Sequence, residues 1–249
     1  MKKLNRIFLA ILLATFAQSA LADLVNGDFE TGDLSGWTAT NNGSAATIQV
    51  TSGDTTTDAG TIPGSLTGDY FVFTSQSGPG SSFLSQPFTV QAGTNKIFFD
   101  IAIINAAGDY YVPDPMSFDY TGPPNQQARF DILVPGAALD TVNPADIIVT
   151  GYQTQPGDPL TQDWASYEVD ATTELAPYVG QNVIFRFVQV DNQLFFNLAI
   201  DNVNVGLSAA GTRPSVAIPV PTMSAYGLIL TILALLFVAS RRLRKPGLE

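Results

Sequence analysis

The sequence contains no cysteine and no histidine. Without histidine, the chain lacks His-based general acid–base chemistry, the Ser-His-Asp and Cys-His nucleophile systems, and the usual catalytic zinc sites. Without cysteine, no disulfide can form. The fold must therefore be stabilised by its core, to which a bound metal ion can add.

Positive charge is also scarce between residues 23 and 219. This region has 21 aspartates and glutamates but only four cations, which gives a net charge of −17; the cations are Lys96, Arg129, Arg186 and Arg213. So acidic a surface disfavours nucleic acid and anionic lipid as partners. Most of the acids are aspartates, which are turn residues and hard oxygen ligands. The composition favours divalent cations and cationic or neutral ligands.

The N-terminus has the organisation of a secretory signal peptide over residues 1–22. A basic start precedes an apolar run at 7–16, and Ala20 and Ala22 form an A-x-A site. The run is shorter than the about 20 residues that span a bilayer. We expect cleavage after Ala22; the alternative is a retained N-terminal anchor.

The C-terminus has a different pattern over residues 220–249. It is uncharged from Met223 to Ser240, and a basic cluster follows at Arg241, Arg242, Arg244 and Lys245. The length predicts a transmembrane helix at about 224–240. Basic residues beside a span stay cytoplasmic, so the preceding domain lies outside the membrane. A buried helix of a soluble protein is the alternative, which the four cations disfavour.

This tail resembles the IPTL-CTERM protein-sorting signals, which are related to the PEP-CTERM tails of Gram-negative bacteria. The matching positions are Val220, Pro221, Thr222, Met223 and Gly227, followed by the apolar span and the basic cluster. Valine, methionine and Tyr226 replace the usual isoleucine, leucine and tryptophan. The resemblance implies recognition by an exosortase-type membrane protease and a final location at the cell surface or in the extracellular matrix.

The middle of the chain has no long amphipathic helical periodicity. Short β-rich runs alternate with Gly, Pro, Asn and Asp, which predicts an all-β antiparallel sandwich, or jelly roll, over residues 23–206. Residues 207–219 read as a flexible linker. The nine expected strands are Ala46–Val50, Tyr70–Thr74, Ser82–Val90, Lys96–Ile104, Ala128–Val134, Asp146–Gly151, Ala165–Asp170, Asn182–Val190 and Phe195–Val205.

Two strands carry additional information. The run at 97–101 is apolar in both phases of the alternation, which indicates a central strand or extra cover on the second face of the sheet. In the last strand the apolar phase changes between Ile200 and Val203, which predicts a β-bulge at Asp201-Asn202.

Three segments together resemble the galactose-binding-like jelly rolls, which include several families of carbohydrate-binding modules. They are LVNGDFETG with the following Gly36-Trp37, then ELAPYVGQ before VIFRF, and finally IDNV. The resemblance implies a structural calcium ion between the first and last segments. Glu30 and Asp201 are then the side-chain ligands, and Asp28 and the Gly27 carbonyl complete the candidate set. In the alternative, Asp28 and Glu30 only form a polar turn.

Two tryptophans and one loop are candidates for ligand contact. In the resembled family, the tryptophan that corresponds to Trp37 packs into the sandwich. Trp164 is a candidate both for core packing and for ligand contact. The loop Asn105–Gln127 combines aromatic and acidic side chains, which suit stacking and hydrogen bonding to a sugar. Its candidate ligand-binding residues are Tyr110, Tyr111, Asp114 and Tyr120. Alternatively, these aromatics fix an edge loop to the sheet.

The combined prediction is an exported surface or matrix protein whose jelly roll binds polysaccharide without catalysis. Glycoside hydrolysis needs two suitably spaced carboxylates, and the region has only three glutamates, with no Glu-x-Asp-x-Glu strand pattern. The predicted partners are exopolysaccharide, the sorting protease and the membrane, but not nucleic acid. A purely structural surface protein and a glycan-active hydrolase are the alternatives.

Overall fold

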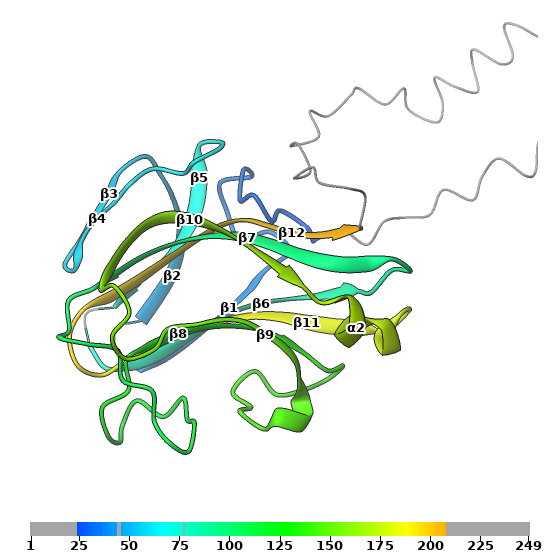
Figure 1. Ribbon diagram of the computed structural model, residues 1–249. Coiled ribbons are helices and arrows are strands. Elements are labelled where there is room, and N and C mark those ends of the chain that lie inside the picture. The colour runs from blue at the N-terminus through cyan, green and yellow to red at the C-terminus, as the bar shows by residue number, and fades with distance from the viewer. Residues whose placement is uncertain (1–23, 44–45, 77, 208–249) are drawn as a thin grey trace, which may run out of the picture. The chain divides into compact units, whose positions relative to one another are not determined.

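The computed structural model describes residues 24–43, 46–76 and 78–207, which form a sandwich of two five-stranded antiparallel sheets (Figure 1). Sheet A has the order β1 (Thr38–Gly43), β6 (Gly80–Thr89), β11 (Asn182–Asp191), β8 (Gln127–Leu133) and β9 (Ile147–Gln153). Sheet B has the order β10 (Thr161–Asp170), β7 (Thr94–Asn105), β12 (Phe196–Leu207), β5 (Tyr70–Gln76) and β2 (Ala46–Ser52). The predicted antiparallel β-sandwich is confirmed.

The chain passes repeatedly from one sheet to the other, as in a jelly roll, and few short elements lie outside the sheets. These are the hairpin of β3 (Thr55–Thr57) and β4 (Gly60–Ile62), the 3-10 helices η1 (Pro144–Asp146) and η2 (Ala176–Tyr178), and the α-helical turn α2 (Thr172–Leu175). All nine predicted strands are present, with ends within four residues of the prediction. The prediction missed β1, β3 and β4. β1 is an edge strand of Thr, Ala, Asn and Gly, and the other two have three residues each.

The main core lies between the sheets and is rich in phenylalanine. Phe130 packs against Phe99 at 4.7 Å and against Phe185 at 4.4 Å between ring centroids. Trp37 is buried in the same core, 5.8 Å from Phe185, and its indole N–H donates to the Asn26 carbonyl at 2.9 Å. The packing role of Trp37 is therefore the one observed.

The outer face of each sheet also carries a covered apolar cluster. On sheet B, Ala102 and Ile104 point away from the main core and pack with Ile62 of the β3–β4 hairpin. Trp164 covers this cluster, with its ring 5.3 Å from Phe71. The second face of β7 is thus covered at Ala102 and Ile104, whereas Phe98, in the run on which the expectation rested, is half-buried. β7 is an interior strand of sheet B, as the other expectation for this run required. On sheet A, loops cover a second cluster formed by Phe83, Phe118, Val188 and Val190.

The last strand contains the predicted bulge. Asp201 pairs with Asp100 and Asn204 with Phe98, so two residues of β12 lie opposite one residue of β7. Asn202 has a φ of 52°, a left-handed conformation that asparagine tolerates better than most residues. The bulge turns Val203 into the main core with Ile200 and leaves Asp201 beside the N-terminal loop.

The predicted terminal signals lie outside the described residues. They are the signal peptide with its cleavage site at Ala20 and Ala22, most of the linker at 207–219, and the sorting tail at 220–249. Within the described part of the chain, no helix is long and apolar enough to cross a bilayer.

Candidate functional site

The N-terminal loop lies against the bulge of β12, as the calcium prediction requires. The backbone N–H of Val203 donates to the Gly27 carbonyl at 2.8 Å. A Cβ atom at Gly27 would lie 2.0 Å from the Val203 carbonyl oxygen, so only glycine permits this close approach. The first and last segments of the resembled pattern are therefore direct neighbours.

Segment 65–70 joins the two acidic side chains predicted as ligands. The Glu30 carboxylate accepts the backbone N–H groups of Asp69 and Tyr70 at 2.8 and 2.9 Å. The Ser65 hydroxyl donates to the Asp201 carboxyl. Both carboxyl groups are thus held beside one segment that sequence analysis did not include in the site.

Asp201 is fully buried, which changes its protonation. Burial raises the pKa of its carboxyl to about 8, against the hydrogen bonds from Ser65 and Asn202, which lower it. The neighbouring carboxylates of Asp100 and Glu30 raise it further. A proton therefore occupies this carboxyl at neutral pH unless a cation takes its place.

The remaining predicted ligands contribute less clearly. Asp28 is half-buried, and its carboxylate accepts the backbone N–H of Glu30 at 3.4 Å, within its own turn. Among the described residues, no three acidic side chains are grouped so that they could hold a metal ion together. A cation here would need carbonyl and hydroxyl oxygens, such as those of Gly27 and Ser65, besides carboxylates. Calcium accepts such mixed oxygen ligands.

A second charged group lies on the outer face of sheet A. Asp131 is fully buried, and both of its carboxylate oxygens accept the Arg129 Nε–H, at 2.7 and 2.8 Å. Arg186, also fully buried, donates to the same carboxylate. Its other terminal nitrogen donates to the carbonyls of Leu139 and Thr141 at 2.6 and 2.8 Å. Two arginines therefore share one carboxylate beneath the loop before β9.

Loop residues cover this charged group on the outer face of sheet A. The Arg186 guanidinium lies 5.1 Å from the centroid of the Phe118 ring, and burial lowers its pKa. Tyr120 and Leu139 pack on the same face. The Asp131 network is missing from the sequence prediction, although the scarcity of arginine in the domain was the available signal.

The structure corrects one of the four predicted ligand-binding residues. Tyr110 is 1% exposed, its ring lies 5.8 Å from Phe196, and its hydroxyl donates to the Pro159 carbonyl at 3.2 Å. Burial raises its pKa. The ring stabilises the base of the loop and has no open face on which a sugar could stack.

The other three residues remain at the surface in different settings. Tyr111 is half-buried and exchanges backbone hydrogen bonds with Gln126 at 2.9 and 3.0 Å. Asp114 is exposed and precedes a cis peptide bond to Pro115. Tyr120 is half-buried against the apolar cluster of sheet A. The alternative in which aromatics fix the loop to the sheet therefore describes Tyr110 and Tyr120.

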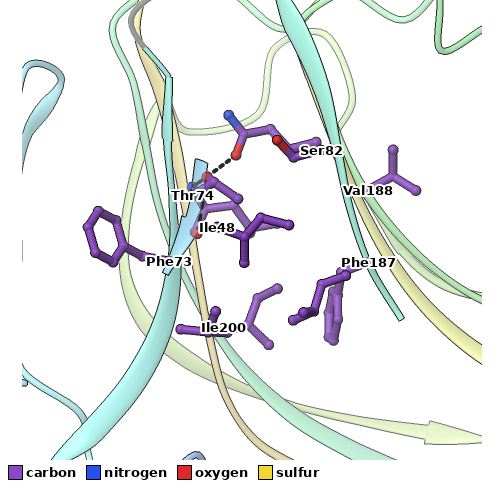
Figure 2. A pocket seen from close by; sticks show the side chains of 11 residues that line it. Ile48, Phe73, Thr74, Ser82, Phe187, Val188 and Ile200 are labelled. Carbon is purple, nitrogen blue, oxygen red and sulfur yellow. Dashed lines mark hydrogen bonds between the residues drawn. The ribbon is translucent and has the colours of Figure 1, made fainter. Parts of the chain in front are cut away.

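The space between the sheets is too small for a ligand. Figure 2 shows Ile48, Ser82, Phe187 and Ile200 pointing into a cavity between the sheets, which Thr74 also lines. Its volume is about 10 Å³, room for one water molecule. Its walls are mainly apolar side chains of the core.

A larger hollow lies at one end of the sandwich, between the β5–β6 and β11–β12 connections. We call it the loop-end pocket; it has a volume of about 220 Å³ and is lined by Gly78, Pro79, Asp191, Asn192, Gln193, Leu194 and Phe195. Leu194 is 55% exposed, whereas Asp191 is 3% exposed. Burial raises the pKa of the Asp191 carboxyl to about 7. An exposed apolar side chain and a buried carboxyl, which accepts the Gln193 N–H at 3.3 Å, thus belong to the lining of one open hollow.

The predicted ligand loop holds the turn of this pocket in place. The Gln126 side chain accepts the backbone N–H groups of Asn192 and Gln193 at 3.3 and 3.2 Å and donates to the Leu194 carbonyl at 2.9 Å. The Asn192 amide donates to the Tyr120 carbonyl at 3.2 Å. The loop Asn105–Gln127 thus supports a pocket whose lining lay outside the predicted strands, except for Phe195 at the start of the last one.

Comparison with known proteins gives structural likeness only. No protein family and no curated protein matches the sequence. Among solved structures, the carbohydrate-binding module TmCBM61 in complex with β-1,4-galactotriose is 14% identical, with a TM-score of 0.47, over 74% of this chain and 97% of its own. A family 11 carbohydrate-binding module from Clostridium thermocellum is 14% identical, with a TM-score of 0.36, over 75% and 96%. A cyclase from Fischerella sp. TAU is 16% identical, with a TM-score of 0.38, over 73% and 94%.

Proposed function

We propose that this domain is a non-catalytic binding module for neutral polysaccharide, and that the loop-end pocket holds the sugar. The observation that carries the proposal is the turn at 192–195. It places the exposed Leu194 beside the buried Asp191 carboxyl, and Gln126 fixes its backbone. Sugar sites combine an apolar surface with a few placed polar groups, and a fixed turn reduces the entropy lost on binding.

Charge supports a neutral ligand over an anionic one. The three cations of the described chain already pair with acids: Lys96 with Glu168, and Arg129 and Arg186 with Asp131. No charged group other than Asp191 lines the loop-end pocket. A phosphate, sulfate or uronate polymer would therefore meet an acidic surface without a free cation among the described residues to bind it.

Replacement of Leu194 tests the site. Leu194→Ala is expected to weaken binding of neutral polysaccharide by about tenfold, because burial of a leucine side chain contributes about 1.5–3 kcal/mol. The matched control is Leu66→Ala, since Leu66 is 54% exposed and lies outside the pocket. Binding is measured by affinity electrophoresis in galactan, glucan and mannan gels.

The same gels separate the alternatives. A wild-type chain that no neutral gel retards would favour the purely structural protein. New reducing ends in the recovered polysaccharide would favour the hydrolase. Equal retardation of the Leu194 and Leu66 variants would place the sugar outside the loop-end pocket.

We also propose that calcium binds between the N-terminal loop and the bulge, with Glu30 and Asp201 as carboxylate ligands and Gly27 and Asp28 as further candidates. The raised pKa of Asp201 supports the proposal, because a cation would stabilise its ionised form. The role is structural, since the ion would link the first segment of the domain to the last strand.

The proposal for the chain ends is export followed by sorting at the membrane. It rests on the sequence of residues 1–22 and 220–249 alone. If an exosortase-type protease removes the tail, mass spectrometry of the surface protein is expected to find a C-terminus upstream of Arg241. An intact Glu249 at the cell surface would instead make the tail a permanent anchor.

A further inference from the structure

A second pocket lies where β6 turns into β7 and α2 begins, and we call it the far-end pocket. Its volume is about 350 Å³, and it is lined by Ala92, Gly93, Thr94, Asn95, Thr172, Ala176 and Val179. No charged side chain is among these residues. Val179 is 49% exposed, and with Ala92 and Ala176 it gives the pocket an apolar wall.

The distinctive group in this pocket is the side chain of Asn95. It is 8% exposed, and its buried Oδ1 atom has no hydrogen-bond partner within the described chain. An unsatisfied buried acceptor costs about 1–3 kcal/mol, and most buried polar groups in proteins avoid this cost. Asn95 is one of the residues that line the far-end pocket, although its Oδ1 atom is itself closed off from solvent. A bound donor reaches this acceptor when the amide turns about χ2, a torsion that is broad in asparagine.

Hydrogen bonds fix the backbone around Asn95, so its side chain projects from a defined position beside the pocket. The Asn95 carbonyl accepts the Ala171 N–H at 2.7 Å. The Thr94 N–H donates to the Gln91 carbonyl at 3.0 Å, and the Thr94 hydroxyl accepts the Gln91 N–H at 3.0 Å. These bonds tie the β6–β7 turn to itself and to the start of α2.

The chemistry of the far-end pocket selects a neutral ligand that carries a hydroxyl group. The unsatisfied Asn95 Oδ1 atom requires a hydrogen-bond donor, and the small apolar wall suits the carbon face of a sugar ring. The Thr172 hydroxyl donates to the Asp170 carboxylate at 2.6 Å, so its oxygen remains an acceptor toward the pocket. Because the pocket offers hydrogen-bond acceptors and no cationic side chain, it disfavours an anionic ligand.

The two pockets lie at opposite ends of the same two strands. β11 runs from beside Val179 to Asp191, and β6 runs from Pro79 to the turn at Ala92. β11 has ten residues, which at about 3.3 Å per residue separates the pockets by roughly 30 Å. One short sugar chain cannot easily fill both pockets, but two separate chains can.

We propose that the far-end pocket is a second neutral-sugar site, with Asn95 accepting a sugar hydroxyl, and that one domain thereby joins two polysaccharide chains. This inference rests on the proposed function and deepens it. Binding at two ends turns a module that decorates a polymer into one that cross-links it, and linked sites also increase avidity.

The test counts sites on the full chain, purified in a detergent without sugar groups. Titration calorimetry with galactotetraose, cellotetraose and mannotetraose in turn is expected to give two sugars per wild-type chain for one of them. Asn95→Ala and Val179→Ala are each expected to weaken the far-end site, and Leu194→Ala is expected to weaken the loop-end site by about tenfold, so each variant keeps one site at the wild-type affinity. Val25→Ala is the matched control, because Val25 is 59% exposed and lies in neither pocket.

A viscosity measurement on the matching polysaccharide tests the cross-linking. The wild type is expected to raise it, and each single-site variant is expected to lose the rise while keeping its remaining site. One sugar per wild-type chain, bound about tenfold more weakly by Leu194→Ala and unchanged in Asn95→Ala and Val179→Ala, would overturn the second site and leave the proposed function standing. No sugar bound by the wild type would overturn both.

Discussion

Asp131→Ala is expected to lower the free energy of unfolding by about 3–5 kcal/mol, the usual cost of removing one partner from a buried ion pair. The change leaves Arg186 fully buried without its paired carboxylate and removes both acceptors of the Arg129 Nε–H. Domains of this size are stable by about 5–15 kcal/mol, so the loss is a large part of the total. Urea unfolding followed by tryptophan fluorescence measures it.

The control is a salt bridge of the same charge type at the surface. Lys96 pairs with Glu168, whose side chain is 51% exposed, and exposed pairs contribute little to stability. Glu168→Ala is therefore expected to unfold at nearly the wild-type urea concentration. If Asp131→Ala also unfolded there, the arginines would have found other partners and the network would not hold the loop over sheet A.

Without calcium, the domain is expected to lose several kcal/mol of stability between pH 5 and pH 8. The carboxyls of Asp191 and Asp201 have folded-state pKa values of about 7 and about 8, against an ordinary value of 3.8. The contribution of each protonated carboxyl to the free energy of unfolding is complete below its ordinary pKa. It is lost as the pH rises through its folded-state pKa. Between its ordinary and its folded-state pKa, each group lowers the free energy of unfolding by about 1.4 kcal/mol per pH unit. Urea unfolding in the presence of EDTA measures the profile.

Two isosteric variants assign the profile to its groups. Asp201→Asn is expected to remove the part of the loss that continues up to pH 8. Asp191→Asn is expected to remove the part that ends near pH 7. Calcium needs the ionised carboxylate, so it should stabilise the wild type more at pH 8 than at pH 5. This response should survive in Asp191→Asn and disappear in Asp201→Asn. A stability that stays constant from pH 5 to pH 8 would show that neither carboxyl keeps its proton in the folded state.

The sequence predicted those parts of the fold that depend on local alternation. Strands with a period of two between Gly, Pro and Asp residues were found with ends close to those observed. The phase change between Ile200 and Val203 located the bulge, because one extra residue reverses which side chains face the core. Trp37 packs in the core, as the resemblance to the galactose-binding-like jelly rolls implied.

The parts that the sequence did not predict depend on pairing across the fold. Asp131 and Arg186 are 55 residues apart and meet only because β8 and β11 are neighbours in sheet A. Tyr110 lies in a sequence typical of a surface loop, yet contacts with Phe196 bury it. The loop-end pocket joins two connections, and neither one has a recognisable motif by itself.

The route of β6 and β11 has a mechanical consequence. If polymers held at the two pockets are pulled apart, the tension passes along two continuous backbones, from Pro79 through β6 to Ala92 and from Val179 through β11 to Asp191. The load is then carried by covalent bonds in strands that are already extended, and the hydrogen bonds between them need not separate. A domain loaded in this direction can transmit force through a hydrated matrix without first losing the hydrogen bonds between its strands.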